Sequence, residues 1–254
     1  MGIQYQDIRV PHEQRGAVAL IDALGTRRLW ESPNPGLEAL KWDLLVQAAE
    51  FGQVNPRTAT ALWRPTPNAV QSVPLPEIHL QYHVAAFSDT FILTLEGAFP
   101  PHDLVHWFGA RVAELFVNGL KNGVSLRGAV ALGSFFESDK AVIGKAISEA
   151  ASCHEKAKWA GIVLTPESVA LLEGSHTDCA FCNRLWPTYD VPVSATGAVT
   201  RTRVLAWPRF FVPFDPSMTR DNVEGWLRSR PTDDGARQKI TNTLTFFDAM
   251  TRNG

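Results

Sequence analysis

The chain of 254 residues is 45% hydrophobic and 20% charged, an ordinary globular composition, and it is long enough for one large domain or two small ones. Its formal net charge of −2 provides no broad basic field, which argues against DNA or RNA polymers as partners. No apolar run approaches the roughly 20 residues needed to cross a bilayer, and the N-terminus lacks the apolar core of a signal peptide, so we expect a cytoplasmic protein that does not enter a membrane.

The first predicted strand lies in the stretch 16–26, GAVALIDALGT. Residues 17–21 form a nearly continuous apolar run, which is typical of a strand covered on both faces. Asp22 follows at the end of this run, and a carboxylate beside so much apolar surface needs a cation or hydrogen-bond donors. Gly25 and Thr26 then form a turn whose backbone N–H groups suit an anion.

Leucine and alanine side chains recur at helical spacing over residues 37–48, which predicts a helix ending near Gly52. Five prolines interrupt residues 54–76 and break any long element. We interpret this stretch as an insertion: a plain loop in preference to a lid or a dimer arm.

A second acid occupies the tip of a predicted hairpin in the stretch 82–97, YHVAAFSDTFILTLEG. Predicted strands at 78–84 and 91–95 flank Ser88, Asp89 and Thr90. Asp22 and Asp89, on the tips of neighbouring strands, would then hold one or two divalent cations, which prefer oxygen ligands. The alternative is that both are turn or cap residues, since Asp is common in turns. The two acids together with the glycine turn favour the metal interpretation.

Further elements follow in alternation. We expect a helix at 101–120, strands at 124–136 and 141–143, a helix opening at Gly144, a strand at 162–164, a hairpin of 185–193 with 202–211, and helices at 219–230 and 235–250. Cys179 and Cys182 form a CAFC pair after His176, but no second pair completes a zinc site. Buried reduced thiols are the preferred interpretation.

This order resembles the catalytic domain of class III nucleotidyl cyclases over about residues 15–170. The family's first metal Asp closes the first strand and precedes a Gly by three residues, as Asp22 precedes Gly25, and its second Asp matches Asp89. Arg127 lies where the family's fourth strand carries an Arg. The resemblance implies an α/β sandwich with a ferredoxin-type βαββαβ core, a mostly antiparallel sheet covered by helices. It also implies a single domain over 1–254 whose hairpin and helices from about 175 onward extend the core.

Departures from the family pattern indicate the substrate. Ser148 and Ser152 stand where the family has its catalytic Asn and Arg. Ala85 and Ala141 stand where it has the Lys and the Asp or Thr that contact a purine. A site without those groups discriminates poorly for purines or is built for another base. The chain thus looks like the bacterial pyrimidine cyclases of Pycsar anti-phage systems, which make cyclic UMP or cyclic CMP. A purine cyclase and a catalytically inactive cyclase-like binding module are the alternatives.

The resemblance also implies a mechanism. Asp22 and Asp89, helped by the carbonyl region of Ile21, would hold two Mg²⁺ or Mn²⁺ ions. The N–H groups of Leu24, Gly25 and Thr26 would face the triphosphate of UTP or CTP. Lys145 could also reach the phosphates, although most lysines are merely exposed. Arg127 is a candidate for the same phosphates, although a structural ion pair is the commoner role of such an arginine.

In this family the active sites lie at a dimer interface, so the resemblance implies a homodimer. The base pocket would include the positions of Ala85 and Ala141. Tyr82 and Phe51 are candidate aromatic groups for narrowing it around a pyrimidine, although ordinary core packing is the commoner role of such residues.

Overall fold

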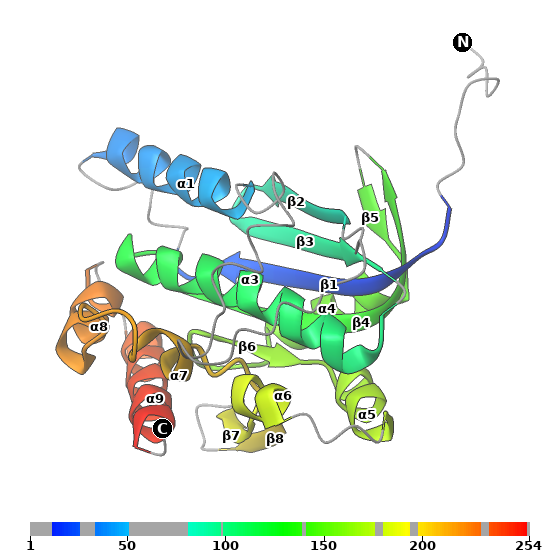
Figure 1. Cartoon of the computed structure of the whole chain (residues 1–254). Helices are drawn as coiled ribbons and strands as arrows, with labels where there is room; N and C mark the ends of the chain where they lie inside the picture. Colours follow the sequence, from blue (N-terminus) through cyan, green and yellow to red (C-terminus); the bar gives the residue numbers. More distant parts are fainter. Residues whose placement is uncertain are drawn as a thin grey trace, which may run out of the picture.

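A computed structural model of the chain describes residues 12–25, 34–50, 81–97, 99–138, 141–175, 180–193, 198–229 and 234–252. At its centre is a six-stranded sheet in the order β2-β3-β1-β4-β5, with β6 paired to β4 (Figure 1). Its strands are β1 (Gln14–Ala23), β2 (Gln81–Phe87), β3 (Thr90–Glu96), β4 (Leu126–Ser138), β5 (Ala141–Ile143) and β6 (Gly161–Leu164).

The chain order of this core is β1, helix α1 (Pro35–Glu50), β2, β3, helix α3 (Pro101–Lys121) and β4. The strands β2, β3, β1 and β4 pair antiparallel throughout, and only β6 runs parallel to its neighbour β4. This is the strand order of a ferredoxin-type βαββαβ unit. The predicted fold class, an α/β sandwich on a mostly antiparallel sheet, is confirmed.

The helices cover both faces of the sheet. On one face, Trp42 of α1 contacts Phe91 with ring centroids 4.6 Å apart, and Phe108 of α3 meets Tyr82 edge-on at 6.4 Å. Helix α4 (Lys145–His154) lies on the opposite face, where His154 reaches Asp22; Figure 1 shows α3 in front of the sheet and α4 behind it. Because side chains alternate along a strand, the middle of β1 is buried from both sides, as its apolar run predicts.

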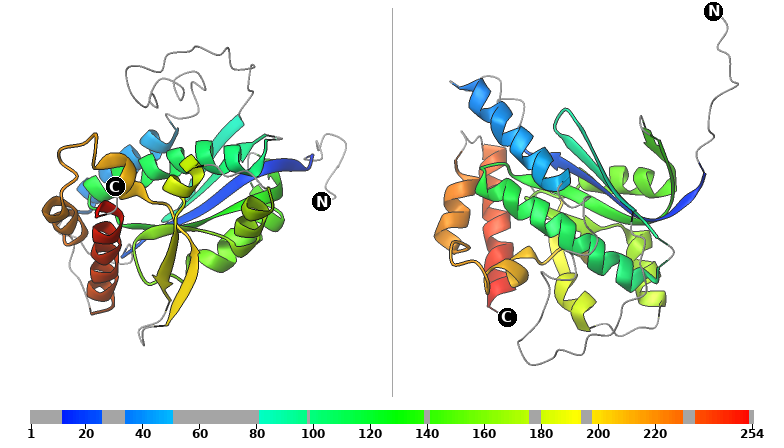
Figure 2. Two further views of the ribbon diagram at one scale, coloured as in Figure 1. Left: turned by 60° about the horizontal axis from the view of Figure 1, so that its bottom comes forward. Right: turned by 45° about the horizontal axis from the view of Figure 1, so that its top comes forward.

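The C-terminal elements pack against the β6 end of the sheet (Figure 2). Helix α9 (Asp234–Thr251) brings Phe246 to Trp159, with ring centroids 4.5 Å apart, and the Thr243 hydroxyl accepts a hydrogen bond from the Ala160 N–H at 2.9 Å. The other elements of this part are α5 (Pro166–Gly174), α6 (Ala180–Leu185), β7 (Thr188–Pro192), β8 (Val199–Arg203), α7 (Trp207–Phe211) and α8 (Arg220–Leu227).

The second strand of the predicted hairpin is mostly wrong. The hairpin forms as β7 and β8, but β8 spans Val199–Arg203 and shares only residues 202 and 203 with the predicted strand at 202–211, and residues 207–211 are the short helix α7. Pro208 explains the change, because its fixed φ suits the first turn of a helix and its missing N–H is not needed there. The predicted helices at 219–230 and 235–250 are confirmed as α8 and α9.

Two cysteines, Cys153 and Cys182, lie inside the described ranges. Cys182 is buried and its thiol donates to the His102 carbonyl at 3.3 Å, while Cys153 is half-buried. His176, Cys179 and the proline-rich stretch 54–76 lie outside the described residues. Among the helices that the structure describes, none has the length and apolar character of a membrane span.

Candidate active site around Asp22

The site begins with a row of polar residues across three strands. Asp22, the penultimate residue of β1, pairs with Thr90 on β3 and with Arg127 on β4. Paired residues of adjacent strands point to the same face. All three side chains therefore lie on the face that α4 covers, at the end of the buried strand.

Both oxygens of the Asp22 carboxylate are engaged. Thr90 Oγ1 donates to Asp22 Oδ1 at 2.7 Å, and His154 Nε2 lies 2.8 Å from Asp22 Oδ2. Burial raises the pKa of Asp22, but the hydrogen bonds from His154 and Thr90 and the charges of His154 and Arg127 outweigh it and hold the pKa below the ordinary value of 3.8.

His154 is the residue that sequence reasoning missed. It is the last residue of α4, and its Nδ1 lies 2.7 Å from the Ala151 carbonyl oxygen while Nε2 faces Asp22. Burial lowers the pKa of His154, and the hydrogen bond to Asp22 and the charge of that carboxylate raise it above its ordinary 6.5. The signal lay in the spacing: Ala146, Ala150 and His154 recur every four residues and form the buried stripe of α4.

Arg127 secures the chain that follows α4. Its Nη1 donates to the carbonyl oxygens of Glu155 and Ala157 at 3.1 and 3.3 Å. Burial lowers the pKa of Arg127, and the carboxylates of Asp22 and Glu155 partly offset this. Its Nε is buried without a hydrogen-bond partner among the described residues. A role on phosphates stays a prediction, because the guanidinium is at present bound to backbone.

Asp89 lies where the hairpin prediction puts it. It is the second residue of the turn between β2 and β3, after Ser88 with its left-handed φ of 56°, and its backbone carbonyl accepts from the Ala23 N–H at 2.8 Å. The ends of β1 and of the hairpin therefore meet, as expected for two acids on neighbouring strand tips. Metal binding by the Asp89 side chain stays a prediction.

The donor set around Asp22 fits a divalent cation. One ligand atom from each of Asp22, His154 and Glu155 lies within 4.8 Å of the others. Carboxylate oxygens and an imidazole nitrogen are ligands that divalent metals accept. Asp22 would hold the ion with His154 and Glu155, and Asp89 would approach from the adjoining turn. The side chain of Ile21 points into the core, so only its carbonyl is a candidate ligand.

The proposed phosphate-binding turn is only partly available. The Leu24 N–H already donates to the Ser125 carbonyl at 2.7 Å, which removes it from the set of N–H groups expected to face a triphosphate. Gly25 adopts a left-handed φ of 78°, which other residues rarely adopt, so the predicted glycine turn is present. Thr26 lies outside the described residues.

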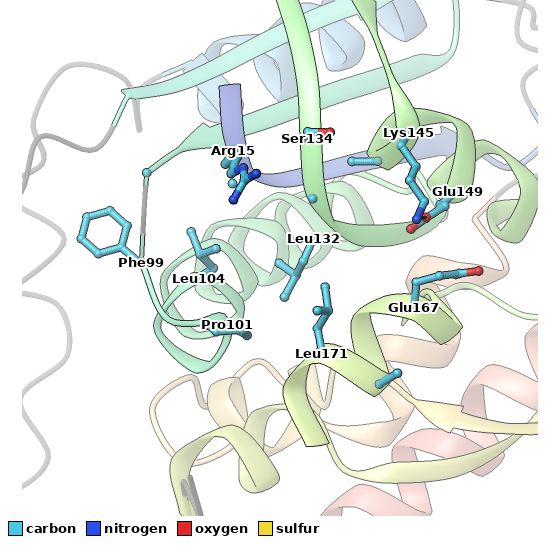
Figure 3. Close-up of a pocket in the computed structure, with 15 residues that line it drawn as sticks. Arg15, Phe99, Pro101, Leu104, Leu132, Ser134, Lys145, Glu149, Glu167 and Leu171 are labelled. Carbon is cyan, nitrogen blue, oxygen red and sulfur yellow. Dashed lines mark ion pairs between the residues drawn. The ribbon is translucent and has the colours of Figure 1, made fainter. Parts of the chain in front are cut away.

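Lys145 lies far from Asp22 within one chain. It begins α4, and the 10 residues of that helix separate it from His154 by about 14 Å. Its Nζ is 3.6 Å from Glu149 and faces a hollow of about 840 Å³ between α3, α4 and α5 (Figure 3). Arg15 lines the same hollow, seven residues before Asp22 on β1, or about 23 Å along the strand.

The candidates for the base pocket are divided between places. Tyr82 packs against Phe108 on the face of the sheet that α1 and α3 cover, where burial raises the pKa of Tyr82. Ala85 is exposed on the opposite face of β2, and Ala141 pairs with Ser138 at the far end of β4 from Arg127. Tyr82 and Ala85 therefore do not line one pocket. Phe51 lies outside the described residues.

The two serines at the family's catalytic positions bond to their own helix. Ser148 Oγ donates to the Gly144 carbonyl at 2.9 Å and Ser152 Oγ to the Glu149 carbonyl at 2.8 Å. Both hydroxyls are on the exposed side of α4, away from the buried stripe that ends in His154.

Comparison with known proteins gives weak likenesses. No family model matches the chain, and no curated protein matches it. Among solved structures, the guanylyl cyclase Cya2 aligns at 11% identity over 77% of this chain and 92% of its own, with a TM-score of 0.42. An adenylate/guanylate cyclase/hydrolase from Silicibacter pomeroyi aligns at 12% identity over 76% and 96%, with a TM-score of 0.40. Likenesses of this degree carry no conclusion about activity.

Proposed function

We propose that the chain is a nucleotidyl cyclase that converts UTP or CTP to its 3′,5′-cyclic monophosphate and pyrophosphate. The observation that supports this best is the register of β1, which sets Asp22 beside the β2–β3 turn that carries Asp89. Two strand-tip acids at one edge of a βαββαβ sheet are what the cyclase resemblance of the sequence requires. The proposal includes the signalling role in anti-phage defence, which rests on that resemblance alone.

The reaction joins the ribose 3′-oxygen to the α-phosphorus while the bond from that phosphorus to the bridging oxygen of the β-phosphate breaks. The hydroxyl proton leaves to solvent, and pyrophosphate departs. Bound divalent ions would neutralise charge on the phosphoryl oxygens and favour the ionised 3′-oxygen. Asp22 and Asp89 would hold them, and the hydroxyl of Thr90 would fix the orientation of the Asp22 carboxylate.

A second copy of the chain would complete the site. Lys145 is at the end of α4 away from His154, Ala141 pairs at the far end of β4 from Arg127, and Ser148 is on the outer side of α4. On β2, Ala85 and Phe87 are exposed, with Phe87 83% accessible. A homodimer would cover this apolar face and bring the partner's α4 toward the acids. We expect a dimer mass in light scattering.

The test is incubation of the pure full-length chain with each of the four nucleoside triphosphates and Mn²⁺, followed by chromatography of the products. Cyclic UMP or cyclic CMP is the expected product. Cyclic AMP or cyclic GMP alone would replace the pyrimidine assignment with the purine alternative. No cyclic product from any of the four would remove the enzyme proposal.

The inactive binding module is the second candidate, and one observation favours it. Asp22 is bound by Thr90 and His154, and the serines at the catalytic positions are bonded to their own helix. For this candidate, we expect saturable binding of a nucleoside triphosphate in calorimetry without turnover.

A further inference from the structure

The imidazole of His154 faces two acceptors. Nδ1 lies 2.7 Å from the Ala151 carbonyl oxygen and Nε2 lies 2.8 Å from Asp22 Oδ2. A neutral imidazole has one N–H and can satisfy only one of the two. The contact between Nε2 and the carboxylate therefore needs either a second proton on the ring or a cation that both atoms bind.

The bond at Nδ1 is the one that a metal-binding histidine makes. Such a histidine commonly donates its other ring N–H to a backbone carbonyl or a carboxylate, which fixes the tautomer and aims the free nitrogen at the metal. Here the Ala151 carbonyl is the acceptor for Nδ1. The Thr90 hydroxyl donates to Asp22 Oδ1 and so orients the carboxylate with Oδ2 toward His154.

Glu155 supplies a third donor. Its Oε1 is 3.9 Å from His154 Nε2, and its side chain is 75% exposed, so it can adjust to an ion. Around an ion with bonds of about 2.1 Å, ligand atoms at right angles lie about 3 Å apart and opposite ones about 4.2 Å apart. The separations of 2.8 and 3.9 Å agree with these values.

The surrounding charges favour a cation and hold its ligands. Asp22 and Glu155 contribute two negative charges, and Arg127 contributes one positive charge. Arg127 bonds to the backbone carbonyls of Glu155 and Ala157, which fixes the segment that carries the third ligand. These three side chains therefore carry a net charge of −1, and the proposed approach of Asp89 would make the surroundings of the ion more negative.

The geometry points to a divalent-ion site in which His154 Nε2 is a direct ligand together with Asp22 and Glu155. This inference deepens the proposed function, on whose Asp22 site it rests, by naming two ligands and the class of ion. An imidazole nitrogen is a better ligand for first-row transition ions than for Mg²⁺, which prefers oxygen and retains water. The site therefore selects Mn²⁺, or another first-row ion, over Mg²⁺.

The test is pulsed electron paramagnetic resonance of the full-length chain with Mn²⁺ alone, with and without ¹⁵N-labelled histidine. Wild type is expected to show nitrogen coupling that changes with the label, and H154Q to lack it. H83Q, which replaces an exposed histidine on β2, is the matched control and keeps the coupling. E155Q changes an exposed side chain and is expected to bind Mn²⁺ at least about tenfold more weakly, since even partners outside the coordination sphere change affinity 10–100-fold.

Bound Mn²⁺ without nitrogen coupling in wild type, coupling that persists in H154Q, unchanged affinity in E155Q, or no Mn²⁺ binding would each overturn the inference. None of these measurements uses turnover, so a failure of this inference can be distinguished from a failure of the proposed function. Cyclic nucleotide production without histidine coupling would remove the His154 ligand and keep the cyclase. Histidine coupling without any cyclic product would do the reverse.

Discussion

Replacing His154 by glutamine in chelator-treated protein should lower the free energy of unfolding by about 1 kcal/mol near pH 5.5 and by much less near pH 8.5. Glutamine keeps a neutral N–H donor of similar reach, so the variant imitates an uncharged imidazole. The difference between the two proteins then isolates the contribution of the positive charge beside Asp22.

The magnitude follows from the contact. The side chains of His154 and Asp22 are only 11% and 20% exposed, and their polar atoms are 2.8 Å apart. A hydrogen bond to a charged group contributes about 1.5–3 kcal/mol and a neutral one about 0.5–1.5 kcal/mol, so the charge accounts for about 1 kcal/mol. In a chain of this size that is roughly 2–4 °C in melting temperature.

The pH window follows from the two pKa shifts. The pKa of His154 is raised above 6.5 in the folded state, so its contribution is complete below that value and is lost as the pH rises through the folded pKa. The pKa of Asp22 is lowered below 3.8, so its contribution is present above 3.8 and is lost as the pH falls through the folded pKa. The ion pair is therefore strongest between the two ordinary values.

The measurement is thermal and urea unfolding of wild type, H154Q and the exposed-site control H83Q by circular dichroism, in buffer with chelator. H83Q measures the effect of replacing an exposed imidazole that lies away from Asp22. Equal destabilisation of H154Q at both pH values, or a larger one at the alkaline value, would refute the charge argument.

Three further predictions concern the strands. Asp22→Ala and Asp89→Ala should each abolish cyclic nucleotide production while the circular dichroism spectrum persists, with an exposed acid, Asp190→Ala, as the control that stays active. Arg127→Met should lower stability by about 1–3 kcal/mol and speed hydrogen exchange in the segment after α4, because two backbone carbonyls lose their donor. Gly128→Ala should lower the melting temperature, because its Cβ would lie 2.6 Å from the Leu20 carbonyl oxygen, a clash that typically costs about 1–3 kcal/mol.

Local patterns in the sequence suffice for the frame of the site. The apolar run 17–21 predicts a strand covered on both faces, and the hairpin pattern puts Asp89 at a tip; both are confirmed. The alternation of side chains along a strand also corrects the predicted base pocket without the structure. Tyr82 and Ala85 are three residues apart on β2, so they point to opposite faces and cannot line one pocket.

The sequence does not show which side chains contact each other across long stretches of the chain. Helical spacing puts His154 on the buried stripe of α4, but nothing local indicates that this stripe ends at Asp22, 132 positions earlier in the chain. Lys145 is a second case. The sequence offers it as a lysine that could reach phosphates, but nothing local indicates that the length of α4 separates it from the end of the helix at Asp22.

The candidate site residues on α4 therefore lie in two separate places, at its two ends. Its C-terminal end completes the surroundings of Asp22 within one chain, and its N-terminal end and outer serines face away from that acid. A substrate bound at Asp22 can meet the outer face of an α4 only if that helix belongs to another copy. In the proposed dimer, His154 would hold the metal ion without contacting the groups that select the base, because it is on the buried stripe of α4 and not on the outer face.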